Sequence, residues 1–321
     1  MPGPHTSLHL LTMLALCIAL SGCIRPDFGD SEAGLALEDL ASGLATSRLA
    51  SGVPRPLRES VSFTTGGEQR AADLYHASQG ARAGIVLVPG VVPRGRRDAR
   101  VIAIANTLAR LDFTVLVPDM PGVRSYRMWS GDAREVADSF AWLASRPALA
   151  PPGHIGIAGF SYGAGPVLLA ALLPDIRERV NFILTVGGYY SMENVVTYLI
   201  TGHYPVDQPA GAVAPATSRL SPHPYALTAF IRSNLDLLER SVDRGFFQRY
   251  AEQIAGDHSD EDERVPARLA PDAQAYYDLL TNHRPARVPA LLDRLSARMR
   301  SALEGIDPAA RDLSRLRADV I

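Results

Sequence analysis

The sequence contains no lysine, and its cysteines are confined to the N-terminal end. All 32 basic residues are arginines, set against 34 aspartates and glutamates, so the net charge at pH 7 is −2. Without lysine the chain cannot form a Schiff base with a carbonyl substrate, nor activate a serine through a Ser–Lys dyad. Because the net charge is close to zero, there is no electrostatic case for nucleic acid as a partner.

The two cysteines, Cys17 and Cys23, belong to an N-terminal segment with an apolar run over residues 8–20. The run is shorter than the roughly 20 residues of a membrane-spanning helix, but it has the length of a signal-peptide core. The junction Leu20-Ser21-Gly22-Cys23 resembles a bacterial lipobox. That resemblance implies a signal peptide over residues 1–22 and lipid attachment at Cys23. The chain would then be exported and anchored by lipid in the bacterial cell envelope, in the periplasm or on the outer surface.

Residues 1–22 depart from this pattern because they contain no lysine or arginine. A plain cleaved signal and an uncleaved anchor therefore stay open as alternatives. Removal of the segment would leave Cys23 as the single cysteine, which excludes an intramolecular disulfide in an exported chain.

The remainder of the 321-residue chain is long enough for one large domain or two modest ones. Continuous apolar runs alternate with segments of helical spacing, and these runs are 83–90, 113–117, 155–158 and 180–186. Such alternation predicts an α/β fold with a doubly wound, mostly parallel sheet. A hairpin at 59–77, turning at Gly66-Gly67, precedes the runs, and the sheet domain is expected over residues 59–188.

The segments on either side of that domain are less regular. Residues 23–58 read as a tether or an N-terminal arm, with weak helical spacing at Leu37, Leu40 and Leu44. Residues 189–306 predict a helical insertion. Two sets of apolar residues there keep helical spacing, namely Ile231, Leu235, Leu238 and Val242, then Leu292, Leu295, Met299 and Leu303. A lid over the site and a purely structural helical layer are both open.

The stretch Gly159-Phe160-Ser161-Tyr162-Gly163 fits the pattern G-x-S-x-G between an expected strand and an expected helix. Glycines at both flanks allow a tight turn that leaves the serine on a strained corner, with its hydroxyl exposed above the sheet. The helix that follows would direct its N-terminal amides toward that hydroxyl, where they could stabilise an oxyanion. This pattern predicts a nucleophile elbow with Ser161 as the nucleophile and Gly159 and Gly163 as the elbow glycines.

The order of these parts resembles the α/β-hydrolase superfamily, in its dienelactone-hydrolase-like and serine-peptidase-like branch. The resemblance implies that Ser161 is the nucleophile and that the backbone N–H groups of Tyr162 and Val91 form the oxyanion hole. Pro89-Gly90 stands where many relatives have His-Gly, a departure that leaves backbone donors in place.

The same resemblance places the catalytic acid and the histidine after two later strands, and the sequence ends at Ile321 inside the first of them. Residues 307–321 are thus expected to return to the sheet, with the final strands of the fold missing from a truncated chain. A serine without a base is a weak nucleophile. The acid and base stay unknown. A histidine of the insertion could act as the base, with Glu193 as a relocated acid. The insertion histidines are His203, His223, His258 and His283. Histidines of this kind are more typical of surfaces and loops.

No motif for a nucleotide, flavin or metal is present, so no cofactor is expected. The acidic segment 257–263 is typical of a solvated loop rather than a metal site. The sequence predicts a cell-envelope serine hydrolase of the esterase, thioesterase or peptidase kind, with impaired activity, acting on a small-molecule or peptide carbonyl. The alternative is a catalytically inactive hydrolase-like protein, anchored at the envelope for binding or interaction.

Overall fold

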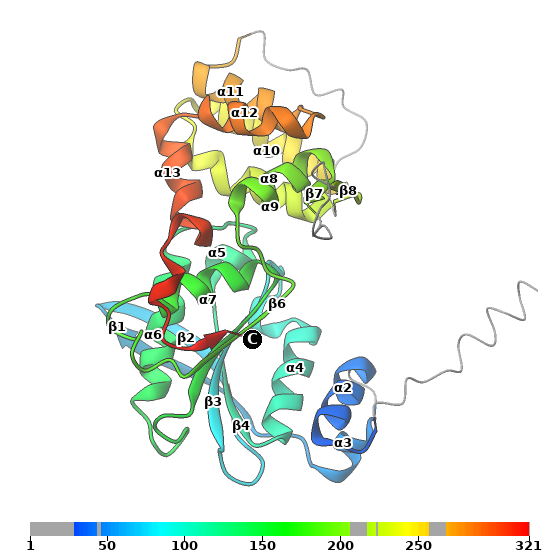
Figure 1. Ribbon diagram of the computed structural model, residues 1–321, viewed down its shortest axis with the longest axis vertical. Helices are drawn as coiled ribbons and strands as arrows, with labels where there is room; N and C mark the ends of the chain where they lie inside the picture. Colours follow the sequence, from blue (N-terminus) through cyan, green and yellow to red (C-terminus); the bar gives the residue numbers. More distant parts are fainter. Residues whose placement is uncertain (1–28, 44–45, 206–216, 223, 257–267, 321) are drawn as a thin grey trace, which may run out of the picture.

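The computed structural model describes residues 29–43, 46–205, 217–222, 224–256 and 268–320. It contains a sheet flanked by helices, with a layer of further helices at one end of the sheet (Figure 1). The predicted signal peptide and Cys23 lie outside the described residues. Within the described residues, no helix is both long enough and apolar enough to cross a membrane.

The sheet has seven strands in the order β1-β2-β4-β3-β5-β6-β9. Their bounds are β1 (Arg58–Thr65), β2 (Glu68–Tyr75), β3 (Ala83–Val88), β4 (Phe113–Pro118), β5 (Ile155–Phe160), β6 (Phe182–Val186) and β9 (Asp319–Val320). The five strands from β4 across to β9 run parallel, whereas β1 and β2 form an antiparallel hairpin whose second strand pairs with β4. The doubly wound, mostly parallel sheet is therefore confirmed.

Helices cover both faces of this sheet, so its central strands are apolar throughout. Every residue of β3 is buried. Val86 and Val88 pack on the face covered by α6 (Asp132–Ala144) and α7 (Ala164–Ala171). Ile85 and Leu87 pack on the opposite face, against α4 (Ala99–Arg110). Because successive side chains of a strand point to opposite faces, two covered faces require a continuous apolar run.

The start of α6 is not a capping box, although the acidic residues Asp132 and Glu135 are three positions apart. Gly131 is the N-cap residue and makes no side-chain capping bond, while Asp132 is the first helical residue. The Asp132 carboxylate instead accepts hydrogen bonds from the Tyr162 hydroxyl (2.5 Å) and the Trp129 amide (3.3 Å). The Asp132 carboxylate therefore bonds to Tyr162, which is distant in the sequence, and does not cap its own helix.

The helical layer follows β6 and contains six helices within the described residues. They are α8 (Met192–Thr201), α9 (Pro224–Asn234), α10 (Ser241–Ala255), α11 (Pro271–Leu280), α12 (Val288–Asp293) and α13 (Ala297–Gly305). A short hairpin of β7 (His203–Pro205) and β8 (Thr217–Arg219) lies between α8 and α9. Figure 1 shows these helices stacked beyond the end of the sheet at which α5 (Pro121–Arg124) lies.

The two helical stripes expected in this layer are each broken. Helix α9 ends at Asn234, and a 3₁₀ turn and a short connection then lead to α10. As a result Leu238 is 1% exposed but Val242 is 53% exposed, so they do not share a buried face. The second stripe is divided between α12 and α13, because Ser296 caps a new helix by accepting from the Met299 amide. Apolar spacing alone does not exclude a turn between two short helices.

The chain enters and leaves the helical layer through two segments that lie side by side. The Ala309 amide donates to the Tyr190 carbonyl (2.9 Å), and the Tyr189 hydroxyl donates to the Ile306 carbonyl (2.8 Å). Entry and exit thus share one point at the edge of the sheet.

At the other end of the chain, α2 (Glu32–Ser42) and α3 (Arg48–Gly52) pack beside α4 (Figure 1). The buried Asp39 carboxylate accepts hydrogen bonds from the Thr107 hydroxyl (2.5 Å) and from Arg110 (3.1 Å), both on α4. Over its described residues, this N-terminal arm thus packs against α4.

Candidate active site

The turn after β5 holds Ser161 in a backbone conformation that is rare for a residue with a side chain. Its φ is +52°, in the left-handed region. A 3₁₀ turn (Ser161–Gly163) follows and leads directly into α7. A strand, a strained serine and a helix in this order are the features of a nucleophile elbow. Ser161 therefore lies on a strained corner between a strand and a helix.

The flanking glycines are required by close contacts within this turn. A Cβ on Gly159 would lie 2.6 Å from the Gly163 carbonyl oxygen. A Cβ on Gly163 would lie 2.7 Å from the carbonyl oxygens of Val88 and Pro89, at the end of β3. Both distances are shorter than real Cβ contacts. Glycine therefore allows the elbow and the end of β3 to pack directly against each other.

The loop after β3 lies directly beside the serine side chain. A Cβ on Gly90 would lie 2.9 Å from the Cβ of Ser161 and 3.4 Å from its Oγ. The next residue, Val91, is buried and lines both cavities that reach Ser161. Tyr162 follows Ser161 in the 3₁₀ turn at the start of α7. The two residues expected to supply oxyanion-hole amides thus lie on either side of the serine.

Ser161 lies between two cavities lined mainly by apolar side chains. The smaller, of about 240 Å³, lies between the loop after β3 and the start of α4. The larger, of about 380 Å³, lies between the elbow and the first helices of the helical layer. Helix α8 contributes Met192, Val195, Tyr198 and Leu199 to it, and α9 contributes Tyr225, Ala226 and Ala229. The first helices of the helical layer therefore form part of the wall of a cavity that reaches the exposed Ser161.

The charged side chains that line the smaller cavity are an ion pair at the start of α4. The Asp98 carboxylate caps the helix and accepts from the backbone amide (3.0 Å) and from the guanidinium (2.9 Å) of Arg100. The hydrogen bond from the Arg100 side chain holds the pKa of Asp98 below its ordinary value. A carboxylate stabilised in this way is a weak base, so its presence in the cavity does not activate Ser161.

A second carboxylate lies behind the elbow. Asp132 is 1% exposed, and the hydroxyl of Tyr162 donates to it at 2.5 Å. Burial raises the pKa of Asp132 to about 6, against the hydrogen bonds from Tyr162 and Trp129. The Tyr162 ring stacks on Tyr189, with ring centroids 6.2 Å apart. The residue after the serine is thus fixed by α6 on one side and by the entry to the helical layer on the other.

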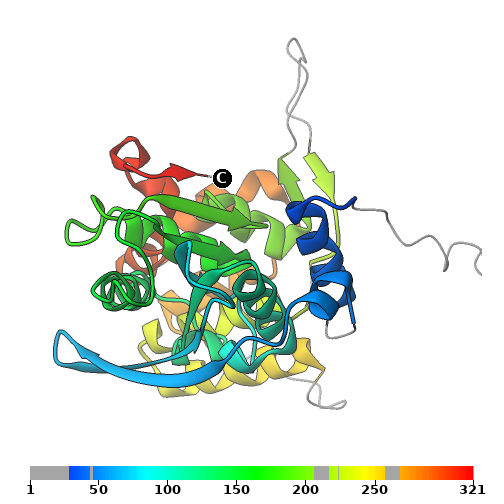
Figure 2. The ribbon, with the colours of Figure 1, turned by 90° about the horizontal axis from the view of Figure 1, so that it is seen from below.

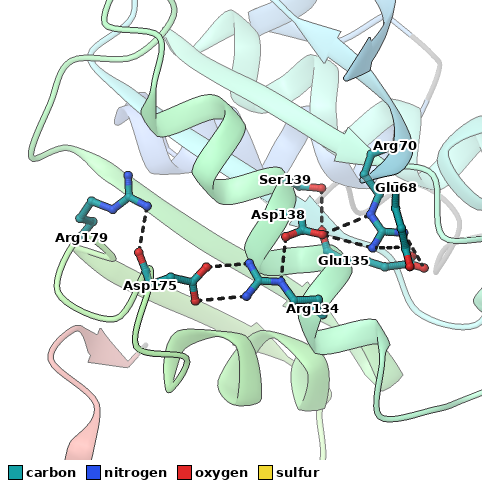
Figure 3. Close-up of polar contacts among 8 residues, drawn as sticks. All are labelled: Glu68, Arg70, Arg134, Glu135, Asp138, Ser139, Asp175 and Arg179. Carbon is teal, nitrogen blue, oxygen red and sulfur yellow. Dashed lines mark hydrogen bonds and ion pairs between the residues drawn. The ribbon is translucent and has the colours of Figure 1, made fainter. Parts of the chain in front are cut away.

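Arginine–carboxylate pairs tie the outer part of α6 to β2 and to the segment after α7 (Figure 3). Arg134 donates to Asp138 (2.7 Å) and to both oxygens of Asp175 (3.1 and 2.8 Å). Arg70 on β2 contacts Asp138 (3.2 Å) and Glu135 (3.5 Å). Burial, followed by the charge of Asp132, raises the pKa of Glu135 to about 7, while Arg70 opposes the rise. These pairs hold the helix that carries Asp132.

The insertion histidines considered as a base are not brought to Ser161 where the structure describes them. His203 is on β7, and its Nδ1 lies 3.0 Å from the Thr201 carbonyl oxygen. His283 is exposed. His223 and His258 lie outside the described residues, as does the acidic segment 257–263. Among the described residues, the linings of the two cavities include no histidine.

The remaining candidates also lie away from the serine. Glu193 is exposed in the first turn of α8 and is not among the residues that line the two cavities. His154 precedes β5 at the end opposite the elbow, as expected of a structural residue. His76 pairs with Glu59 (2.9 Å) on the outer hairpin. Within the described residues, no three metal-ligating side chains come together.

Sequence reasoning did not identify Asp98, Asp132 or Tyr225 as residues of the site. Asp98 carries one signal, because an aspartate before a helical run is a typical N-cap. Asp132 and Tyr225 carry none, since their closeness to the elbow depends on how α6 and α9 pack.

Comparison with known proteins gives neighbours in structure only. No family model matches the chain, and no curated protein matches it. One similar solved structure is a dienelactone hydrolase from Anabaena variabilis, with 20% identity over 42% of this chain and 64% of that chain and a TM-score of 0.36. Another is an esterase from the archaeon Pyrobaculum calidifontis, with 18% identity over 63% of this chain and 65% of that chain and a TM-score of 0.38. An acylaminoacyl peptidase from Pyrococcus horikoshii is another (13% identity, 48% and 26%, TM-score 0.37).

The chain spans less than two thirds of the length of each of these three proteins. The parallel sheet covered on both faces, the strained serine after β5 and the helix α7 behind it are features of the chain itself. Together they give the protein an α/β fold with a mostly parallel sheet and a helical layer beside the elbow.

Proposed function

We propose that the protein is a serine hydrolase of the bacterial cell envelope that acts slowly on esters, thioesters or amides with apolar groups on both sides of the carbonyl. The observation that carries this proposal is Ser161, an elbow serine with a φ of +52° that opens into two mainly apolar cavities. A serine in that position can reach a carbonyl whose two substituents occupy the two cavities.

In the reaction, the Ser161 Oγ attacks the carbonyl carbon, and the carbonyl oxygen takes on negative charge. The backbone N–H groups of Val91 and Tyr162 would donate to that oxygen, and the start of α7 would add its positive dipole end. Collapse of the intermediate expels the alcohol, thiol or amine and leaves an acyl group on Ser161, which water removes. The serine proton needs an acceptor, and Asp98 with its lowered pKa is a weak one, so we expect slow turnover.

Lipid attachment at Cys23 is the second part of the proposal. It is supported by the lipobox-like junction before Cys23. The packed arm that begins at Ser31 would then connect the anchor to α4, which lines the smaller cavity.

A second candidate function is a hydrolase-like binding protein without catalysis. It is favoured by the positions of the described histidines, of which His203 bonds to a local carbonyl and His283 is exposed. In that case the two cavities would hold a small apolar ligand that Ser161 does not attack.

Labelling with a fluorophosphonate probe distinguishes the two functions. We expect slow labelling of the full chain that is lost in Ser161→Ala and kept in Ser314→Ala, a matched change of an exposed serine. Labelling that persists in Ser161→Ala would contradict the assigned nucleophile. No labelling of a chain shown to be folded by its thermal unfolding transition would leave the binding protein as the function.

A further inference from the structure

Helix α2 places its polar and apolar residues opposite to the usual arrangement. An amphipathic helix on a globular protein normally turns its apolar face inward. Here Asp39 is 3% exposed and hydrogen-bonds to α4, whereas Leu37 and Leu40 are 52% and 39% exposed. The helix is held to the body by a buried carboxylate, and Leu37 and Leu40 point away from the body.

The exposed apolar residues form one continuous stripe. Ala33, Leu37, Leu40 and Ala41 are all exposed, and their positions i, i+4, i+7 and i+8 share one face of a helix. We call this set the apolar stripe. Single exposed leucines are ordinary on protein surfaces, but four apolar residues at helical spacing define a face.

The acidic side chains of the same helix are paired with arginines from other elements. Glu38 pairs with Arg48 on α3 at 2.5 Å, and Glu32 pairs with Arg82 before β3. Asp39 is paired with Arg110. Because each carboxylate is next to a guanidinium, the helix can approach an apolar or anionic surface with little charge repulsion.

The position of α2 in the chain indicates which surface that is. Ser31, the N-cap of α2, is only eight residues after Cys23, and an extended chain of that length spans at most about 28 Å. A lipid on Cys23 would therefore hold α2 within that distance of the bilayer. Figures 1 and 2 show α2 at the outer edge of the molecule, on the far side of α4 from the rest of the sheet domain.

We propose that the apolar stripe of α2 rests on the surface of the lipid bilayer and fixes the orientation of the body above it. The inference depends on the anchoring through Cys23 in the proposed function. A lipid chain and an interfacial helix face are two separate membrane signals, and two signals bind more firmly than one. The stripe would thus hold the side of the molecule that carries α4 and the smaller cavity toward the membrane.

The test uses the small number of cysteines, because removal of residues 1–22 takes away Cys17 and leaves only Cys23. The full precursor is matured in bacteria, so that lipid occupies Cys23, and a single cysteine is introduced by Ala33→Cys on the stripe. Ala290→Cys, at an exposed alanine of α12, is the matched control. Each is labelled with a small fluorophore and reconstituted in vesicles of phosphatidylethanolamine and phosphatidylglycerol that contain a lipid-borne quencher.

We expect the label at position 33 to be quenched several-fold more than the label at position 290. The double change Leu37→Ser and Leu40→Ser should remove that difference while the protein still floats with the vesicles. Leu220→Ser, a change of another exposed leucine, should leave it intact. Since these side chains are exposed, none of the changes should alter the unfolding temperature.

Three results would overturn the proposal. One is equal quenching at both positions in protein that floats with the vesicles. Another is a label at position 33 that is shielded from solvent without vesicles, in a protein that is a dimer until the double change is made. That result would mean that the apolar stripe binds a second copy of this chain. The third is failure of the unmodified protein to float, which would remove the anchor on which the inference depends. Labelling of Ser161 is measured separately, so none of these results is confused with loss of the hydrolase function.

Discussion

The sheet and the helical layer bury different kinds of side chain. The sheet packs aliphatic residues between strands and helices, with Val86, Leu116 and Ile157 fully buried. The helical layer has a core of its own, rich in aromatic rings, among them Phe230, Phe246, Phe247 and Tyr276. Each region therefore has its own source of stability.

Few side chains belong to both regions. Met128 and Tyr189 pack against both cores, and both also line the larger cavity beside Ser161. The candidate site therefore lies at the junction of two separately packed regions. Changes in one region should then affect the other mainly through the site.

The largest effect is expected from Phe247→Ala in the core of the helical layer. Phe247 is fully buried, and loss of such a ring costs about 3–5 kcal/mol. Hydrogen exchange should quicken in α9–α11 while β3 and β5 stay protected. Val242→Ala, at an exposed position of α10, is the control. Equal loss of protection in both regions would show that they unfold as one unit.

The second effect concerns pH. The folded pKa of Asp132 is about 6, above its ordinary 3.8, so the folded protein holds this proton more tightly than the unfolded chain. Between those values, stability should rise as pH falls, and this group contributes about 2–3 kcal/mol. The free energy of unfolding can be measured with urea at pH 7 and at pH 4. In Asp132→Asn its increase between these two pH values should be smaller by about 2–3 kcal/mol than in the unmodified chain. In Asp312→Asn the increase should be unchanged. Parallel pH profiles of Asp132→Asn and the unmodified chain would show that Asp132 does not titrate as described.

The third effect tests the elbow from the side of the sheet. In Gly159→Ala the new methyl group would meet the Gly163 carbonyl at 2.6 Å, and overpacking of this kind costs about 1–3 kcal/mol. The rate of labelling at Ser161 should fall strongly even though the protein stays folded, because the turn that carries the serine must move. Gly52→Ala, which meets nothing within 4 Å, should change neither. An unchanged labelling rate in Gly159→Ala would mean that the elbow tolerates a displacement.

The smallest effect is expected at the ion pair between Arg127 and Asp236, which joins the segment before α6 to the helical layer. Both side chains are at least half exposed, and such pairs contribute below about 1 kcal/mol. A double-mutant cycle with Arg127→Gln and Asp236→Asn should give a small coupling that vanishes in high salt. A coupling above that size would indicate that this pair fixes the helical layer over the sheet.

The sheet could be predicted from the sequence because its physics is local. A parallel strand covered on both faces must be apolar at every position, and runs such as 83–90 show this directly. The elbow could be predicted because its turn requires glycine at 159 and 163. For Gly159 the nearest contact lies within the turn, and for Gly163 it lies at the end of β3, so in both cases the glycine in the sequence marks a close approach of the backbone.

The site around the serine could not be predicted to the same extent. Its walls come from the loop after β3, from α4 and from α8 and α9, which are far apart in the sequence. The continuous helices predicted in the insertion were wrong for a related reason. The turn after Asn234 buries Leu238, and a continuous helix would bury it too, so the spacing does not distinguish the two structures. Tertiary packing, rather than spacing, decided both.

The shared entry and exit of the helical layer has an evolutionary consequence. The bonds from Ala309 to Tyr190 and from Tyr189 to Ile306 close the insertion at its base. The distance between β6 and β9 is therefore independent of how much chain lies beyond that closure. Insertions, deletions or exchange of the whole helical segment could change which molecules reach Ser161 and leave the sheet intact. The access to the candidate site and the fold of the sheet can thus diverge at different rates in descendants of this gene.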